Sequence, residues 1–271
     1  MIRESLEATS SLVRTKMVMP KKRVLSIEVN AGSYQSFVET IIAAAKQRVS
    51  KYVCIANVHM LVEAHQDSTF AKVVNNADVV TPDGMPIAWA MKLLYKMKQD
   101  RVAGMDLLPD LLKQAEKLQL PVFFYGGTEE MLSATSRYIH QHYPQLHIAD
   151  LYSPPFRMLT AAEEGNIVER INASGAAFVF VVLGCPKQEK WMASMKGRVN
   201  AVMVGIGGAL PVMIGLQSRA PQWMQRNGLE WLYRFIQEPK RLFKRYAITN
   251  SIFLFLLLKE LLKQKIVSNR G

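Results

Sequence analysis

Phe178-Val179-Phe180-Val181-Val182-Leu183 runs directly into Gly184-Cys185-Pro186-Lys187, and these two segments indicate the fold class. A short continuous run of β-branched and aromatic residues is typical of a strand buried on both faces, as in a parallel sheet. The glycine and the proline then interrupt the strand, and a segment of helical period starts at Lys187. The two segments therefore predict one strand, loop and helix of an α/β fold.

The same unit recurs along most of the 271-residue chain, because apolar runs of strand length alternate with segments of helical period. The predicted strands cover residues 24–29, 52–57, 78–81, 122–125, 147–151, 178–183 and 201–204. The predicted helices cover residues 36–48, 68–76, 85–95, 107–119, 128–142, 160–173 and 187–196. This alternation predicts a Rossmann-like, largely parallel sheet flanked by helices.

The net charge of +12 divides the chain into three parts. Residues 1–23 carry six Lys or Arg against two Glu, and we expect a flexible N-terminal leader there. Residues 24–218, the expected α/β core, contain 17 Lys or Arg and 17 Asp or Glu, and a neutral body of this kind does not suit binding along nucleic acid. Residues 219–271 hold eleven Lys or Arg against three Glu, which predicts a basic helical C-terminal appendage.

The last part of the appendage predicts a helix over residues 246–266 that is apolar in the middle and flanked by cations. Its longest apolar run, residues 252–258, is far shorter than the roughly 20 residues needed to cross a bilayer. Such a helix is expected to lie in the membrane interface, where each cation near an anionic leaflet adds on the order of 1 kcal/mol. The alternative is a helix packed on the core or on another subunit, which leaves a homo-oligomer open.

Two features predict a cytoplasmic protein. The first residues lack the continuous apolar segment and cleavage site of a signal peptide. Cys54 and Cys185 are the only cysteines, and they lie apart in or beside apolar runs, as buried thiols of a reducing compartment do. Together with the basic appendage, these features predict peripheral association with the inner face of the cytoplasmic membrane.

Polar residues accompany the loops that follow the predicted strands, and the carboxyl ends of parallel strands usually form the binding crevice. Asp83 stands in the tight turn Pro82-Asp83-Gly84, where a rigidly held carboxylate could act as a base, although the tripeptide alone is an ordinary turn. Arg101 lies in a loop just ahead of a predicted helix, and a guanidinium there suits bidentate binding of a phosphate.

Three further loops offer binding groups. Gly126 and Gly127 precede a predicted helix, so backbone N–H groups and the helix dipole could receive a diphosphate. Gln188 stands in the first turn of the helix that follows Pro186, where its amide could bind a sugar hydroxyl or a uracil edge. Gly207 belongs to a Gly-rich loop that allows close backbone approach.

The absence of several sequence motifs argues against some classes of enzyme. The chain contains neither G-x-G-x-x-G nor G-x-x-x-x-G-K-[ST], which weakens the case for a dinucleotide or ATP enzyme. Its five histidines have no metal-ligand spacing, and there is no D-x-D pair. We therefore expect no metal and no cofactor, and we expect Lys, Arg and backbone N–H groups to neutralise the charge of a departing diphosphate.

Seven stretches, taken in order, resemble the WecG/TagA/CpsF family of glycosyltransferases. They are residues 77–86 (ADVVTPDGMP), 101–108 (RVAGMDLL), 124–127 (FYGG), 183–191 (LGCPKQEKW), 205–209 (GIGGA), 219–226 (RAPQWMQR) and 228–234 (GLEWLYR). The resemblance covers roughly residues 24–246. It implies an inverting transferase that moves a sugar, often N-acetylmannosamine or its uronic acid, from a UDP-sugar to an acceptor sugar on a polyprenyl diphosphate. Such an enzyme would serve the synthesis of a cell-surface polysaccharide or a teichoic-acid-type polymer.

The resemblance also assigns roles to residues. It implies that Asp83 is the base and that Arg101 and Gln188 bind the donor or the acceptor, while Asn57 would help to orient the sugars. It further implies that the C-terminal appendage touches the membrane and brings three arginines over the donor diphosphate; these are Arg234, Arg241 and Arg245. One position departs from the pattern, since many members carry a threonine where this chain has Ile55.

Two alternatives belong to other functional classes. One is a nucleotide-dependent oxidoreductase on a similar α/β sheet, which would bind NAD or FAD. The other is a non-enzymatic module that binds a membrane surface and for which the appendage alone would explain the activity.

Overall fold

Six parallel strands form the central sheet in the computed structural model, which describes residues 19–268. Their order across the sheet is β4-β3-β8-β7-β5-β6. In chain order the strands are β3 (Lys51–Ala56), β4 (Val79–Pro82), β5 (Val122–Gly126), β6 (Ile148–Tyr152), β7 (Phe178–Val182) and β8 (Val202–Gly205). The predicted fold class, a Rossmann-like and largely parallel sheet flanked by helices, is confirmed.

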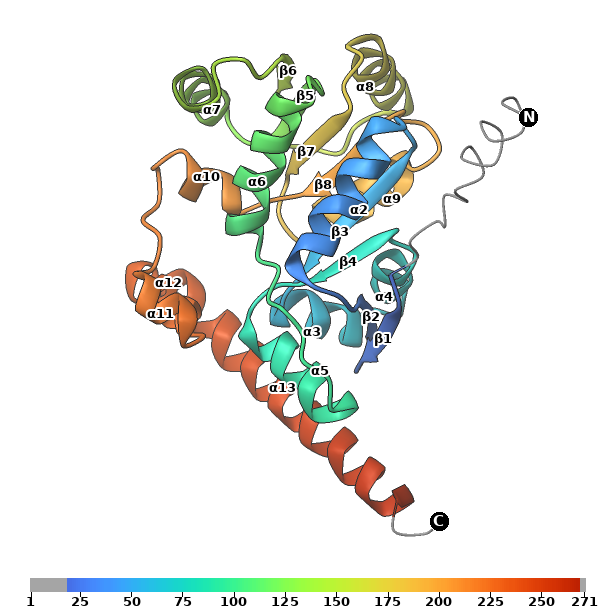
Figure 1. Cartoon of the computed structure of the whole chain (residues 1–271), viewed down its shortest axis with the longest axis vertical. Coiled ribbons are helices and arrows are strands. Elements are labelled where there is room, and N and C mark those ends of the chain that lie inside the picture. Colours follow the sequence, from blue (N-terminus) through green and yellow to red (C-terminus); the bar gives the residue numbers. More distant parts are fainter. Residues whose placement is uncertain (1–18, 269–271) are drawn as a thin grey trace, which may run out of the picture.

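Helices cover both faces of the sheet (Figure 1). One face packs against α3 (Val58–Gln66), α4 (Ser68–Asn75), α8 (Ala161–Ala173) and α9 (Lys187–Met195). The other packs against α2 (Tyr34–Lys46), α6 (Gly104–Lys117), α7 (Glu129–His142) and α10 (Ala209–Met213).

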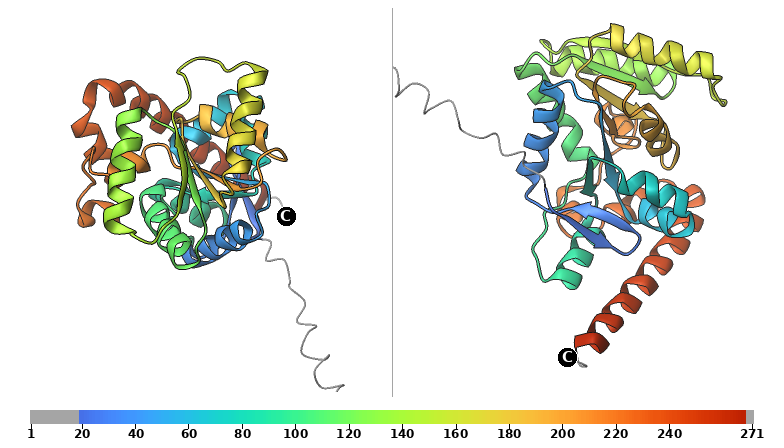
Figure 2. Two further views of the ribbon diagram at one scale, coloured as in Figure 1. Left: turned by 90° about the horizontal axis from the view of Figure 1, so that it is seen from above. Right: turned by 90° about the vertical axis from the view of Figure 1, so that its right-hand side faces the viewer.

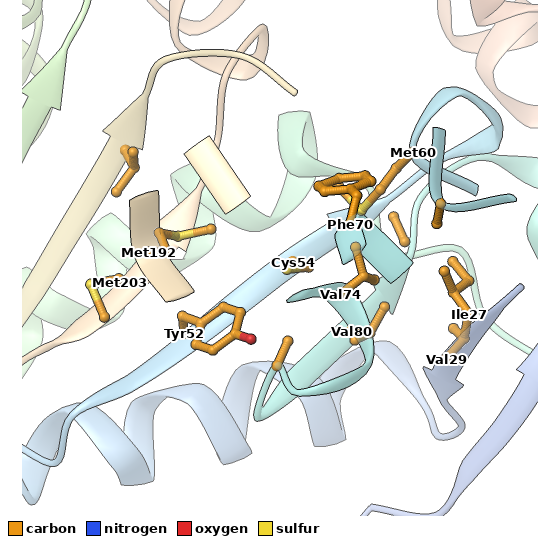
Figure 3. Close-up of a cluster of buried hydrophobic side chains, with 14 of the residues drawn as sticks. Ile27, Val29, Tyr52, Cys54, Met60, Phe70, Val74, Val80, Met192 and Met203 are labelled. Atoms are coloured by element: carbon orange, nitrogen blue, oxygen red, sulfur yellow. The ribbon is translucent and has the colours of Figure 1, made fainter. Parts of the chain in front are cut away.

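The two apolar layers follow from the alternation of side chains along each strand. In β3, Tyr52 and Cys54 point into one layer, and Val53 and Ile55 point into the other. Figure 3 shows Tyr52 and Cys54 in the first layer, among side chains from neighbouring strands and from covering helices. Because the inner strands β3, β8, β7 and β5 are buried on both faces, they are almost continuously apolar, which is the property that identified them in the sequence.

The chain leaves two neighbouring strands, β3 and β8, toward opposite faces of the sheet. It continues from β3 into α3 on one face and from β8 into α10 on the other. Diverging connections of this kind open a crevice at the carboxyl ends of the strands. The point of the sheet where a binding crevice is expected therefore lies at the carboxyl ends of β3 and β8.

The C-terminal appendage consists of α11 (Gln222–Arg226), α12 (Glu230–Gln237) and α13 (Pro239–Ser268). The long α13 contains the helix expected over residues 246–266 and packs against α3 and against α5 (Met85–Tyr95). Figure 1 and the right-hand view of Figure 2 show that α13 runs diagonally past the core and projects beyond it at its C-terminal end.

One predicted strand is wrong. Residues 24–29 do not form a strand of the main sheet but belong to an antiparallel hairpin of β1 (Lys21–Val24) and β2 (Ile27–Asn30). The chain reverses at Leu25, whose φ of 56° ends the extended backbone. The hairpin also takes residues 21–23 out of the expected leader, and residues 1–18 lie outside the described part of the chain.

The helix α3 is absent from the predicted set, as are the short helices α10, α11 and α12. The sequence does contain a start signal for α3, because Asn57 caps its first turn by accepting a hydrogen bond from the backbone N–H of Met60 at 3.1 Å. The prediction had extended the preceding strand through Asn57.

Candidate active site

Two backbone contacts place Asp83 beside the end of β3. The N–H of Asp83 donates to the carbonyl of Ala56 at 2.8 Å, so the residue that follows β4 is fixed against the last residue of β3. Asn57 comes next in the chain, and its side chain forms a hydrogen bond with Asp83. Because the Asn57 oxygen accepts from the N–H of Met60, its amide nitrogen is the group left to donate to the Asp83 carboxylate. Asp83 and Asn57, which were both expected to belong to the site, therefore meet.

Hydrogen bonds also attach the Arg101 loop to the strand that carries Asp83. The backbone N–H of Val102 donates to the carbonyl of Pro82 at 2.9 Å. The hydroxyl of Thr81, which is fully buried, donates to the carbonyl of Val102 at 3.1 Å. Arg101 is thereby held next to the turn of Asp83, although helix α5 separates the two residues in the sequence.

Carboxylates hold the guanidinium of Arg101 on two sides. One terminal nitrogen pairs with Asp106 of α6 at 2.8 Å, and the other pairs with Glu230 of α12. Arg219 pairs with the second oxygen of Asp106. Arg101 and Asp106 thus connect the core to the appendage. A phosphate that bound Arg101 through both terminal nitrogens would have to compete with these carboxylates.

The surroundings of Asp83 shift the pKa of its carboxyl group to about 7. Burial and the negative charge of Glu230 raise this pKa, while Arg101, Arg234 and the hydrogen bond with Asn57 lower it. A base works best when its pKa lies near the operating pH, because it is then both available and able to take a proton. This carboxyl group can therefore accept and release a proton at neutral pH.

Gln188 lies at the same edge of the sheet but is almost completely buried, at 5% exposure. Its side chain fits against the Gly-rich loop, since a Cβ at Gly205 would lie 2.9 Å from its amide nitrogen and one at Gly207 would lie 3.2 Å from its oxygen. The amide nitrogen donates to the buried carboxyl of Glu189 at 2.7 Å. The Gln188 oxygen is buried and has no hydrogen-bond partner among residues 19–268.

Two of the three arginines expected from the appendage lie near residues of this site. A Cβ at Gly208 would lie 2.9 Å from a terminal nitrogen of Arg234, and the charge of Arg234 acts on Asp83. Arg245 lies near His59, which follows Asn57 by two residues in α3 and whose pKa is lowered by burial and by the Arg245 charge. Arg241 belongs to α13, and its side chain lies outside the described part of the structure.

The Gly126-Gly127 loop is shaped by packing. Gly126 has a φ of 100°, and a Cβ there would lie 2.6 Å from the carbonyl oxygen of Val182 on the neighbouring strand. Thr128 caps the helix that follows, and Glu129 and Glu130 occupy its first turn. Two carboxylates at that end would repel a diphosphate. The sequence-based role of Gly126 and Gly127 in binding a diphosphate stays a prediction.

Two carboxylates at the site were not identified from the sequence. Glu230 lies inside the family-like stretch GLEWLYR, yet nothing local shows that it meets Arg101, which precedes it by more than a hundred residues. Glu189 follows Gln188 directly, and its full burial depends on the tertiary fold. Ile55, where a threonine was expected, is a buried aliphatic residue, and a Cβ at Gly104 would lie 3.4 Å from it.

Comparison with known proteins gives the family. The model of the "Glycosyl transferase WecG/TagA/CpsF family" matches residues 22–267. The chain is 33% identical over 216 residues to a protein of Bacillus spizizenii, covering 79% of this chain and 81% of that protein. It is 27% identical over 242 residues to a protein of Staphylococcus aureus, covering 88% and 92%.

Both relatives are named N-acetylglucosaminyldiphosphoundecaprenol N-acetyl-beta-D-mannosaminyltransferase, as is a protein of Bacillus subtilis that is 30% identical over 209 residues, 75% of this chain and 80% of its own. These matches favour glycosyl transfer over the alternatives of an oxidoreductase and a non-enzymatic membrane module. The chain is an enzyme that belongs to the WecG/TagA/CpsF family of glycosyl transferases.

Proposed function

We propose that this enzyme transfers N-acetylmannosamine, its uronic acid or a related hexose from a UDP-sugar to a sugar carried on a polyprenyl diphosphate, with inversion at the anomeric carbon. The names of the relatives support the transferred sugar and the lipid-linked acceptor. The observation that carries the proposal is the position of Asp83, a half-buried carboxyl group with a pKa of about 7 that faces Arg101 and Arg234 at the carboxyl edge of the sheet.

The reaction follows from this arrangement. The Asp83 carboxylate takes the proton of an acceptor hydroxyl, whose oxygen attacks the anomeric carbon on the face opposite the UDP. The bond from the anomeric carbon to the diphosphate oxygen breaks, and UDP leaves with the electron pair. Arg234 and Arg101 then stabilise the growing negative charge.

Gln188 and Asn57 would orient the sugars. Asn57 holds the carboxylate of Asp83 through its amide, and Gln188 offers an unpaired oxygen beside the Gly-rich loop. An oxygen of this kind accepts a hydrogen bond, so it fits a hydroxyl or an N–H group of the ligand.

The surface of α13 supports a location at the membrane. No helix within residues 19–268 is long and apolar enough to span a bilayer. Five exposed apolar residues nevertheless form a stripe along α13, and Lys259, Lys263 and Lys265 interleave with it. The stripe consists of Leu254, Phe255, Leu258, Leu262 and Ile266. An apolar face beside cations suits the interface of an anionic leaflet, which here would be the inner face of the cytoplasmic membrane.

The decisive experiment supplies the enzyme with a panel of UDP-sugars and a short-chain polyprenyl-diphospho-N-acetylglucosamine, and weighs the products by mass spectrometry. We expect the acceptor to gain the mass of one N-acetylhexosamine when UDP-N-acetylmannosamine is the donor, and free UDP to form in equal amount. Transfer from a different UDP-sugar would change the identity of the proposed donor but not the proposed class of reaction. The absence of transfer from every UDP-sugar would refute the proposal.

A further inference from the structure

Glu230 is the first residue of α12. Among the residues of the appendage, its charge has the largest effect on the pKa of Asp83. It pairs with Arg101, and its side chain is only 18% exposed. Its second oxygen is buried and has no hydrogen-bond partner among the described residues. Burying a carboxylate costs free energy, and here only one of its two oxygens has a partner. A buried polar group of this kind calls for an explanation, such as a functional role.

The charges around Asp83 show what that role is. Asp83 faces Arg101 from the loop before α6, Arg234 and Glu230 from α12, and the neutral Asn57 at the start of α3. The terminal nitrogens of Arg101 are occupied by Glu230 and Asp106. Arg101 therefore makes its close ion pairs with these two carboxylates, although its charge lies near Asp83.

Without Glu230, the released nitrogen of Arg101 would be free to pair with Asp83. An aspartate paired with an arginine is held in its ionised form and is a weak base, because taking a proton would break the pair. We propose that Glu230 is a positioning residue, which docks the appendage on the core through Arg101 and keeps Arg101 from pairing with Asp83. The inference rests on the proposed function, in which Asp83 is the base.

The test is the pH dependence of kcat/KM for E230Q, which keeps the shape of the side chain and removes its charge. Wild-type kcat/KM should rise with pH through about 7 as Asp83 ionises. In E230Q we expect this acid limb to move to lower pH, since Arg101 and Arg234 then act on Asp83 without opposition. We also expect the plateau at high pH to fall about tenfold or more, because the base is weaker.

Two controls separate charge from docking. R219Q removes a second ion pair between appendage and core, that of Arg219 with Asp106. It should lower kcat/KM by one factor at every pH and leave the acid limb in place. E230D keeps the charge and should retain the wild-type limb. Unfolding temperatures of all variants identify any that have lost the fold.

The inference is overturned if E230Q keeps the wild-type limb, or if R219Q or E230D shifts the limb as far as E230Q does. Failure of the proposed function is a separate result, because D83N would then keep both its turnover and its acid limb. If D83N abolishes the limb while E230Q leaves it unchanged, the base assignment stands and the role of Glu230 falls.

Discussion

The carboxyl group of Asp83 links stability to catalysis at the scale of one residue. Burial raises the pKa of Asp83 from its ordinary value of 3.8 to about 7. Because the native protein then binds the proton more tightly than the unfolded chain, the resulting stabilisation is present in full below about pH 4 and is lost as the pH rises through 7. The ionised base is therefore kept at the expense of stability.

The variant Asp83→Asn separates the two effects. It cannot take a proton, so we expect kcat to fall about 10²- to 10⁴-fold while UDP binding is retained. It also carries no charge to bury, so its unfolding temperature should exceed that of the wild type by a margin that grows from pH 4 to pH 8. Activity assays, calorimetry of UDP binding and thermal unfolding at several pH values check these points.

The matched control is Asp110→Asn, which changes another carboxylate of the core, one that accepts a hydrogen bond from Tyr34 at 2.6 Å. We expect near wild-type turnover there. A D83N enzyme with wild-type turnover would remove Asp83 from the role of base, and a constant stability margin across the pH range would contradict its raised pKa.

Residues whose position follows from the local sequence were the ones that could be predicted. Asp83 was found because a carboxylate in a tight turn after a strand points to the crevice of a parallel sheet. Glu230 was missed because its partner lies in a distant loop, and a single sequence contains no sign of that contact. The place of Arg245 near His59 could not be read from the sequence, since it depends on how α13 packs on α3, and its role at a diphosphate stays a prediction.

At the scale of elements, the strands of the main sheet were predicted well and the chain reversal at Leu25 was not. The six strands of the main sheet were located to within a residue or so because continuous apolar runs mark them. The hairpin of β1 and β2 was read as one strand, because its turn at Leu25 contains neither glycine nor proline. Helix α3 was lost because its capping residue, Asn57, also ends an apolar run.

Two glycines in different elements should respond oppositely to alanine. Gly126 has a φ of 100° at the end of β5, and a Cβ there would lie 2.6 Å from the carbonyl oxygen of Val182. Gly165 lies inside α8, and a Cβ there would meet nothing within 4 Å. We expect G126A to lower the free energy of unfolding by about 1–3 kcal/mol and G165A to raise it by about 0.5–1 kcal/mol.

Urea denaturation of both variants measures these changes, and the m-value shows whether the unfolded state is affected as well. If G126A were as stable as the wild type, the close contact between β5 and β7 would not be a rigid feature of the sheet.

At the scale of the whole molecule, the exposed stripe on α13 should decide attachment to membranes. The double variant Leu258→Glu/Leu262→Glu places two negative charges in the stripe, which oppose both apolar insertion and attraction to an anionic leaflet. We expect wild-type protein to float with vesicles that contain phosphatidylglycerol and the variant to remain at the bottom of the gradient.

The control is Phe156→Glu/Met158→Glu, which alters two side chains that are 86% and 93% exposed in the loop between β6 and α8. It makes the same change in net charge, and we expect it to float like the wild type. If both double variants stayed with the vesicles, the stripe would not be the surface that attaches the protein.

The order of the strands also bears on how the chain can be completed during synthesis. The last strand to be made, β8, lies between β3 and β7, and so joins the pair β4-β3 to the group β7-β5-β6. When only the first two hundred residues have been synthesised, β8 is missing and the sheet consists of two separate parts. In each part the strand that will pair with β8 has an unpaired edge, which can pair with a strand of another chain. The four residues of β8 close both sides at once, so the nascent protein stays vulnerable to aggregation until nearly its whole core has emerged.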